Sequence, residues 1–209
     1  MSLSAASVDG KDYGERVEAP FTVLVVCRAN VCRSPVAEVV MNRYLGDAGI
    51  NDVVAVYSAG TDVLPGDPMC KQGVAWLGLS GAPRAAVALT ASILAGADLV
   101  LAADRQARTA CANLDPGCRP RLFTLNQAAV LAAAIAPAPA PASDRTERLR
   151  WLTGEMDASR ILLSGRDEEL DDIVDRHGLE DHAAVFEEVS SSGLAVVSGF
   201  DWYIAPGSV

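Results

Sequence analysis

A buried strand that runs directly into a short polar loop and then into a helix constrains this chain most strongly. Residues 21–26 read FTVLVV, a nearly unbroken apolar run that is typical of a parallel strand covered on both faces. Cys27 and a short loop follow, and then Ser34 and Pro35 supply a helix start, because a hydroxyl can cap a helix and proline is tolerated in its first turn. The segment predicts a strand, a tight loop and a helix in direct succession.

The loop that follows Cys27 predicts an oxyanion site. In this layout the backbone N–H groups and the helix N-terminus point toward the sulfur, and such donors bind a tetrahedral oxyanion. Arg33 would close the ring, since its planar guanidinium can hold two phosphate oxygens. The same positive field favours a thiolate, which makes Cys27 a candidate nucleophile for covalent phosphoryl transfer. Open α/β sheets also place their ligands at this end of the strands.

Residues 26–35, VCRANVCRSP, resemble the signature V-C-x-G-N-x-C-R-S-P of the low-molecular-weight protein tyrosine phosphatases. Alanine replaces the usual glycine at Ala29, which would cost about 1 kcal/mol if this position needed a positive φ. The resemblance implies catalytic roles for Cys27 and Arg33. It also implies a phosphate-binding loop made of Arg28, Ala29, Asn30, Val31, Cys32, Arg33 and Ser34.

Two loop side chains gain further roles from this resemblance. Ser34 could donate a hydrogen bond to the Cys27 thiolate, which would make the sulfur a better leaving group, although a plain helix cap would look the same in sequence. In the resembled family the cysteine at the position of Cys32 can form a reversible disulfide with the nucleophile. A small side chain packed under the loop is the alternative for Cys32.

The segment Ser58–Thr61, reading SAGT, follows a second predicted strand and also matches the family. There the serine fixes the phosphate loop through the asparagine of the loop, which implies a contact between Ser58 and Asn30. An ordinary turn at the end of a strand is the alternative. The family usually carries a histidine shortly before Thr90, and Arg84 stands at the nearest position here.

The resemblance returns after residue 170, where the family places an aspartate-proline-aromatic loop that carries its general acid. This position maps onto Asp175, which Arg176 and His177 follow in place of the proline and the aromatic residue. A tyrosyl oxygen leaves slowly unless it is protonated, so Asp175 would act as the acid and then activate water. Asp172 is the next candidate, and a solvated acidic loop with no catalytic role is the alternative.

The net charge and the cysteine content limit the classes of partner and cofactor that this chain is expected to bind. The net charge of −10 argues against nucleic acid or an anionic membrane. A phosphotyrosine protein or a small aryl phosphate is the expected substrate, and the oligomeric state is not indicated. The five cysteines form no CxxC pair, so we expect no metal, no other cofactor, and a reducing compartment, by default the cytoplasm.

The chain length suits one domain. We expect a polar N-terminal tail at residues 1–19 and, over 20–209, a single three-layer α/β domain with a four-stranded parallel sheet and flanking helices. An Ala/Pro-rich insertion is expected at about 126–166, because residues 128–142 are nearly all alanine and proline and should not pack a core. A polar helix from 144 to 156 follows it. The insertion would be a surface excursion or a lid.

Two other functions share the loop. A thioredoxin-coupled arsenate reductase has the same fold and the same Cys-x5-Arg loop, and it needs two further cysteines to relay a disulfide. Cys111 and Cys118 have a suitable separation for this. A non-catalytic phosphotyrosine-binding module is the third possibility, in which the loop holds the phosphate without transferring it.

Overall fold

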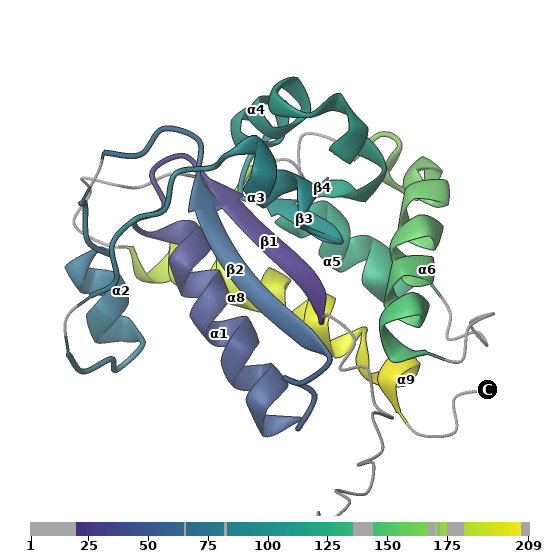
Figure 1. Ribbon diagram of the computed structural model, residues 1–209, viewed down its shortest axis with the longest axis horizontal. Helices are drawn as coiled ribbons and strands as arrows, with labels where there is room; N and C mark the ends of the chain where they lie inside the picture. Colours follow the sequence, from purple (N-terminus) through teal and green to yellow (C-terminus); the bar gives the residue numbers. More distant parts are fainter. Residues whose placement is uncertain are drawn as a thin grey trace, which may run out of the picture.

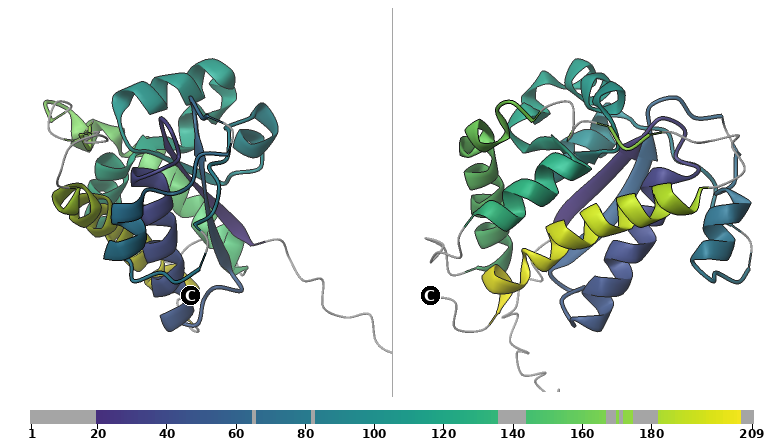
Figure 2. Two further views of the ribbon diagram at one scale, coloured as in Figure 1. Left: turned by 90° about the vertical axis from the view of Figure 1, so that its left-hand side faces the viewer. Right: turned by 180° about the vertical axis from the view of Figure 1, so that it is seen from behind.

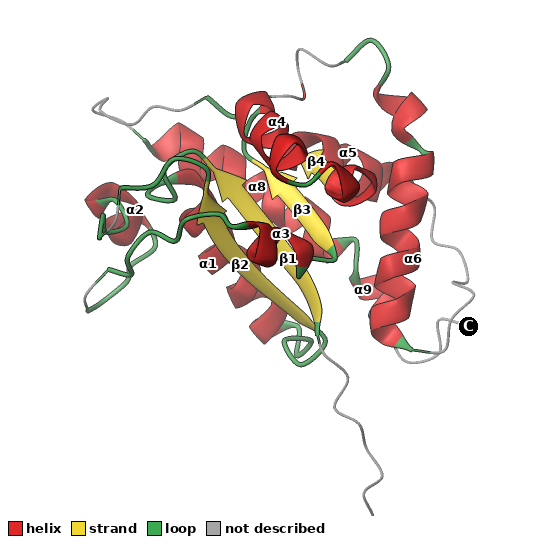
Figure 3. Cartoon of the chain, turned by 45° about the horizontal axis from the view of Figure 1, so that its top comes forward, coloured by secondary structure: helices red, strands yellow, loops and turns green. Residues whose placement is uncertain are grey.

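Four parallel strands form the sheet in the computed structural model, which describes residues 20–64, 66–81, 83–135, 144–166, 170, 172–174 and 182–205. The strands are β1 (Phe21–Cys27), β2 (Val54–Gly60), β3 (Leu99–Ala102) and β4 (Leu122–Thr124), in the order β2-β1-β3-β4 (Figure 3). The predicted four-stranded parallel sheet is confirmed. The expected tail at residues 1–19 lies outside the described residues.

Helices cover both faces of this sheet (Figures 1 and 2). On one face lie α1 (Arg33–Asp47), α5 (Leu125–Ala134), α6 (Arg145–Ala158), α8 (Ala183–Ser198) and α9 (Asp201–Ile204). On the other lie α3 (Ala91–Ala95), α4 (Arg105–Leu114) and the 3-10 segment η1 (Pro116–Arg121). The short helix α2 (Lys71–Trp76) follows β2, and the 3-10 segment η2 (Arg160–Leu163) follows α6.

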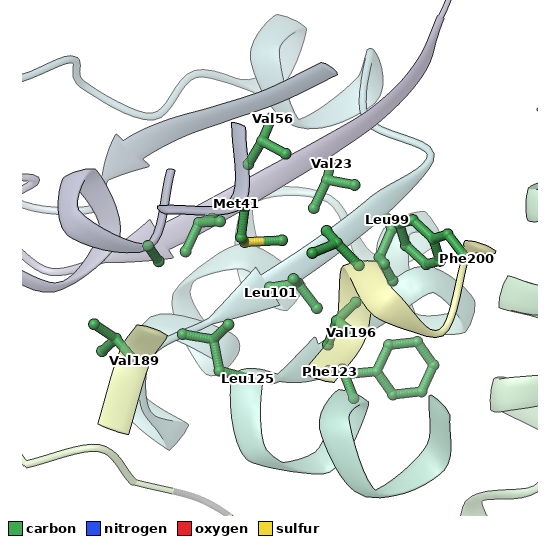
Figure 4. Close-up of a cluster of buried hydrophobic side chains, with 14 of the residues drawn as sticks. Val23, Met41, Val56, Leu99, Leu101, Phe123, Leu125, Val189, Val196 and Phe200 are labelled. Atoms are coloured by element: carbon green, nitrogen blue, oxygen red, sulfur yellow. The ribbon is translucent and has the colours of Figure 1, made fainter. Parts of the chain in front are cut away.

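The two faces form two separate apolar cores because successive side chains of a strand point to opposite sides. In β1, Val23 and Val25 pack into the core under α1 and α8, whereas Leu24 and Val26 pack into the core under α3 and α4. Figure 4 shows the larger core, in which Val23, Leu99 and Phe123 from the strands meet side chains of α1 and α8. Burial on both faces explains the unbroken apolar sequence of the central strand.

Several helices begin at the side chains that cap them. Thr90 accepts a hydrogen bond from the Ile93 amide and begins α3, and Asp104 accepts one from the Ala107 amide and begins α4. Thr124 and Gln127 form a reciprocal capping box at the start of α5, which satisfies two amides that otherwise lack a helical partner. Because the strands are parallel, their carboxyl ends, including that of β1, all lie at one edge of the sheet.

The expectation that residues 128–142 would not pack a core is wrong for the first part of that stretch. Residues 125–134 form α5, and Leu125, Ala128 and Leu131 are fully buried in the core against α8. Alanine leaves room for a close helix approach, so an alanine-rich run can pack a core when its neighbours supply the larger side chains. The expected helix at 144–156 is confirmed as α6, with Asp144 as its cap, and it also packs into this core. Residues 136–143 lie outside the described part.

Within the described residues, no helix has the length and apolar character needed to cross a lipid bilayer.

Candidate active site

Cys27 is the last residue of β1, and its sulfur lies at the centre of a group of polar contacts. The Asn30 amide donates to Cys27 Sγ at 3.3 Å, and Ser34 Oγ lies 3.0 Å from the same sulfur. The side chain is only 2% exposed. A thiolate here would therefore be held by donors from both the loop and the first turn of α1.

The carbonyl groups of the loop are held on its outer side. The carbonyl oxygens of Cys27 and Arg28 accept hydrogen bonds from the amides of Thr61 and Asp62, and the Val31 carbonyl accepts one from Cys70. In a trans peptide the N–H points opposite to the C=O, so the amides that follow these carbonyls point to the inner side of the loop. The Asn30 amide already lies there against the sulfur. This arrangement suits an oxyanion on the inner side.

Asn30 is the one residue other than glycine with a positive φ, 54°, in the described part of the chain. Asparagine tolerates this left-handed conformation better than most residues. Ala29 therefore needs no positive φ, and the strain that we considered for the glycine-to-alanine change does not arise. The left-handed turn falls one position later than that argument assumed.

The Asn30 side chain uses all of its hydrogen-bonding capacity. Its Nδ2 donates to Ser34 Oγ at 2.8 Å and to Ser58 Oγ at 2.7 Å. Its Oδ1 accepts from the Val87 amide at 2.8 Å, a contact that fixes which way the amide faces. The expected contact between Ser58 and Asn30 is thus present. Ser34 takes part in this group rather than capping α1, whose cap is Cys32, so the predicted cap was wrong.

Arg84 occupies the place where the resembled family usually has histidine, and it joins the same network. Its Nη2 donates to Ser58 Oγ, to Asn30 Oδ1 at 3.3 Å and to Glu38 Oε2 at 2.9 Å. Ser58 in turn donates to Glu38 at 2.6 Å. Burial raises the pKa of the Glu38 carboxyl, although the hydrogen bond from Ser58 and the charge of Arg84 act in the opposite direction. Sequence analysis missed Glu38, which no motif marks.

Gly60 lets β2 approach the loop closely. A Cβ at this position would lie 2.7 Å from the Arg28 carbonyl oxygen and 2.8 Å from the Asn30 amide nitrogen. Both distances are below normal contact, and both atoms belong to the backbone of the loop. The glycine of the SAGT segment is therefore required by packing against the loop rather than by its own turn.

Arg33 is almost fully buried, and two groups hold its guanidinium. Nη1 donates to Asp104 Oδ2 at 2.6 Å and to the Ile173 carbonyl at 2.9 Å. Asp104 lies two residues after the end of β3 and also caps α4, so one carboxylate positions both the helix and the arginine. Sequence analysis did not select Asp104, although its place at the end of a parallel strand was a usable signal.

The candidate acid segment reaches this arginine. Ile173 donates its amide to the Ala103 carbonyl at 2.9 Å, and its own carbonyl contacts Arg33. Asp172 Oδ1 accepts from the Arg105 amide at 2.6 Å, which gives this carboxylate a structural contact. Asp175, Arg176 and His177 lie outside the described residues.

An open cleft of about 760 Å³ lies between α4 and Asp172–Val174, and Cys27 is not among the described residues that line it.

Two further loop residues, Arg28 and Cys32, have side-chain contacts outside the group around the Cys27 sulfur. Arg28 forms an exposed pair with Asp62, Nε to Oδ2 at 3.5 Å, which contributes little to stability. Cys32 Sγ lies 3.9 Å from His182 Nδ1 and close to the Cys70 thiol. The contact with the Cys32 thiol lowers the pKa of Cys70 to about 6, with smaller contributions from the Gly73 amide and from His182, while burial opposes the shift.

The cysteine pair considered for an arsenate reductase is deeply buried. Cys111 in α4 and Cys118 in η1 both belong to the core between the sheet and α4, with no measurable exposure. Burial and the neighbouring Cys118 raise the pKa of Cys111 to about 12, and burial also raises the pKa of Cys118. Thiols in this state react slowly in disulfide exchange, so the geometry does not favour a relay.

Comparisons with known proteins agree with this geometry. A family model described as low molecular weight phosphotyrosine protein phosphatase matches residues 22–130. The probable low molecular weight protein-tyrosine-phosphatase EpsP of Ralstonia nicotianae is 32% identical over 109 residues, which cover 51% of this chain and 71% of that protein. The protein of the same name from Ralstonia solanacearum is 37% identical over 83 residues, covering 38% and 53%.

A solved structure shows the same fold. The crystal structure of the low molecular weight protein tyrosine phosphatase from T. tengcongensis superposes with a TM-score of 0.60, covering 85% of this chain and 98% of that one, at 23% identity. The matched family region includes β1, the loop and β2 but ends before the segment at 172–174. The matched region therefore contains Cys27, Arg33 and the rest of the loop but not Asp175.

Proposed function

Because this chain belongs to the low molecular weight phosphotyrosine protein phosphatase family, we propose that it hydrolyses phosphotyrosine and related aryl phosphate monoesters through a phosphocysteine at Cys27. It is a phosphomonoester hydrolase of the protein-tyrosine-phosphatase type. The observation that carries the assignment of the nucleophile is the pair of contacts on Cys27 Sγ, from the Asn30 amide and Ser34 Oγ, at the carboxyl end of the central strand.

In the first step the Cys27 thiolate attacks phosphorus. The sulfur–phosphorus bond forms while the bond from phosphorus to the aryl oxygen breaks, and that oxygen takes a proton from Asp175. The amides on the inner side of the loop and the guanidinium of Arg33 bind the phosphoryl oxygens, whose charge they stabilise throughout. Asp104 and the Ile173 carbonyl fix the plane of that guanidinium.

In the second step water attacks phosphorus and gives its proton to the Asp175 carboxylate, while the sulfur–phosphorus bond breaks. The hydroxyl of Ser34 can donate to the departing sulfur, because its oxygen accepts from Asn30 and the sulfur, at 3.0 Å, is nearer than its other acceptor, the Ala59 carbonyl at 3.4 Å. The position of Asp175 in the sequence supports this role, because it lies two residues after Ile173, whose carbonyl contacts Arg33. Asp172 is less suited, because its carboxylate binds the Arg105 amide.

We further propose that the enzyme works in the cytoplasm. All five cysteines lie in the described part of the chain, and no disulfide joins any of them, which suits a reducing compartment. The net charge of −10 disfavours nucleic acid as a partner. The substrate is therefore expected to be a phosphotyrosine protein or a small aryl phosphate ester.

The function is tested by comparing two substrates with leaving groups of different acidity. Cys27→Ser should abolish hydrolysis of both phosphotyrosine and para-nitrophenyl phosphate, whereas the matched variant Cys118→Ser should retain it. Asp175→Asn should lower kcat on phosphotyrosine by about 100-fold or more, and less on the nitrophenyl ester, whose leaving group hardly needs a proton. The exposed Asp52→Asn serves as its control.

Each outcome has a definite consequence. Equal hydrolysis by the wild type and Cys27→Ser would rule out the proposed nucleophile. Binding of phosphotyrosine without any turnover would indicate the non-catalytic module instead. An unchanged kcat for Asp175→Asn on phosphotyrosine would remove Asp175 from the mechanism.

A further inference from the structure

Three side chains of the kind that bind metals converge beside the phosphate loop from distant parts of the sequence. Cys32 ends the loop, Cys70 precedes α2, and His182 precedes α8. The two sulfur atoms and a ring nitrogen of the histidine all lie within 4.8 Å of one another. We propose that Cys32, Cys70 and His182 form a binding site for a zinc ion.

The spacing of the ligand atoms is close to what zinc requires. Zinc binds thiolate sulfur at about 2.3 Å and imidazole nitrogen at about 2.0 Å, and tetrahedral angles then place the ligand atoms about 3.5 to 3.8 Å apart. Cys32 Sγ and His182 Nδ1 are 3.9 Å apart in the structure. Closing the whole cluster around an ion therefore requires side-chain movements of about 1 Å or less.

Backbone contacts hold each of the three ligands in place. The Cys32 carbonyl accepts from the Val36 amide in the first turn of α1, and the Cys70 amide donates to the Val31 carbonyl at 2.9 Å. The His182 amide donates to Gln72 Oε1 at 3.2 Å. Ligands that are fixed before the metal arrives lose little conformational freedom on binding it.

The donor set and its burial favour zinc over the common hard cations. Two thiolates and an imidazole suit zinc, whereas magnesium and calcium require oxygen ligands. Cys32 and His182 are buried, with 7% and 5% exposed, but Cys70 is half-buried and leaves a route for the ion. Three protein ligands would leave the fourth position to water.

A bound ion would connect two parts of the proposed active site. Cys32 directly precedes Arg33, and His182 is the first described residue after the segment that contains Asp175. Zinc would therefore hold the end of the phosphate loop to the start of α8 and would occupy both thiolates. This site goes beyond the proposed function, and it exists or fails independently of Cys27 chemistry.

Metal binding is measured on the full chain, reduced and freed of metal with a chelator. Zinc alone is titrated against a chromophoric competitor, and cobalt(II) is used as a spectroscopic probe of thiolate ligands. The wild type and Cys27→Ser should each bind one equivalent with a thiolate–cobalt charge-transfer band and a raised Tm. Cys70→Ala and His182→Ala should each lower the affinity for zinc by at least about tenfold. Loss of a residue that only supports a metal ligand already lowers metal affinity by about that factor.

A matched variant separates this site from general effects of removing a thiol. Cys118→Ala removes a cysteine from the opposite core and should bind zinc as the wild type does. The proposal is overturned if Cys27→Ser loses zinc while Cys70→Ala keeps it, because the ion would then bind the nucleophile. It is equally overturned if the reduced chain binds no zinc. This holds even if air oxidation of the chain then yields a disulfide between Cys32 and Cys70.

Discussion

Asn30 shapes the loop after Cys27 through both its backbone and its side chain. It takes the left-handed backbone conformation that turns the loop, and the Nδ2 and Oδ1 atoms of its side chain bind Ser34, Ser58 and Val87. A side chain without both donors and acceptors could not make these contacts. The resemblance of the loop and of the SAGT segment to the phosphatase family implied the contact between Asn30 and Ser58, and this contact is present.

Arg84 contacts Asn30 directly, and Glu38 contacts both Arg84 and Ser58. Removing either side chain should therefore lower catalytic activity. Replacing Arg84 by Met leaves the half-buried Glu38 without its cation and removes one donor from Ser58 and one from Asn30. We expect kcat/KM on para-nitrophenyl phosphate to fall by about tenfold, the equivalent of one hydrogen bond to a charged group. Steady-state kinetics check this.

The control for this change is Arg145→Met. Arg145 forms an ion pair with Asp52 at 3.0 Å, and both side chains are well exposed, so its removal should leave kcat/KM unchanged. If Arg84→Met also leaves kcat/KM unchanged, then Arg84 does not position the loop.

Cys70 should react as a thiolate at unusually low pH. Its pKa is lowered to about 6, chiefly by the contact with the Cys32 thiol. Since the thiolate is the reactive form, alkylation of Cys70 by iodoacetamide should rise with pH to a half-maximal rate near pH 6 in the metal-free chain. In urea the midpoint should move up toward pH 9, the usual value for this group. Peptide mass spectrometry separates this reaction from that of Cys27.

The Cys32→Ser variant tests the cause of that shift. Without the thiol contact the midpoint for Cys70 should move toward higher pH. A midpoint near pH 9 in the native wild-type chain would show that Cys32 and Cys70 do not interact as described.

At the scale of elements, the end of β2 lies close to the loop after Cys27, and Gly60 has the least room for a Cβ of the described glycines. Gly60 pairs with Cys27 in the sheet register and lies against the loop backbone. Gly60→Ala would force the loop to move, because its Cβ would meet backbone atoms at 2.7 and 2.8 Å. A shift of the loop by about 1 Å should lower kcat by about 100-fold. Kinetics and circular dichroism together check that activity falls while the fold remains.

Gly46→Ala is the matched control for this substitution. Gly46 lies in α1, and a Cβ there would meet nothing within 4 Å, so alanine should raise stability by about 0.5–1 kcal/mol and leave kcat unchanged. Equal activities of the two variants would contradict the close packing between β2 and the loop.

How well the elements could be predicted depended on their local signals. The first strand was predicted at residues 21–26 and is observed at Phe21–Cys27, and the predicted sheet of four parallel strands is present. Helix α5 was missed because alanine gives little periodic contrast, and its burial comes from α8, which lies far along the chain. The cluster of Cys32, Cys70 and His182 was missed for a related reason, since no spacing rule covers ligands so widely separated.

The complete fold brings these elements to one edge of the sheet. β1 delivers Cys27, β2 delivers Ser58 and Gly60, and the turn after β3 delivers Asp104 to Arg33. This convergence follows from the parallel topology, and the fold class was therefore predictable from the pattern of apolar runs. The packing of α5 and α6 was not predictable from that pattern. A surface excursion was expected there, whereas both helices belong to the same core as α1 and α8.

The phosphocysteine at Cys27 can be tested by trapping the covalent intermediate. Phosphotyrosine is mixed with excess enzyme, the reaction is stopped by denaturant within milliseconds, and the digested chain is analysed by mass spectrometry. We expect one phosphate on the peptide that carries Cys27 and none on that peptide in Cys27→Ser. Full hydrolysis with phosphate on another residue, or with no phosphoenzyme at any time before the first turnover is complete, would contradict this expectation.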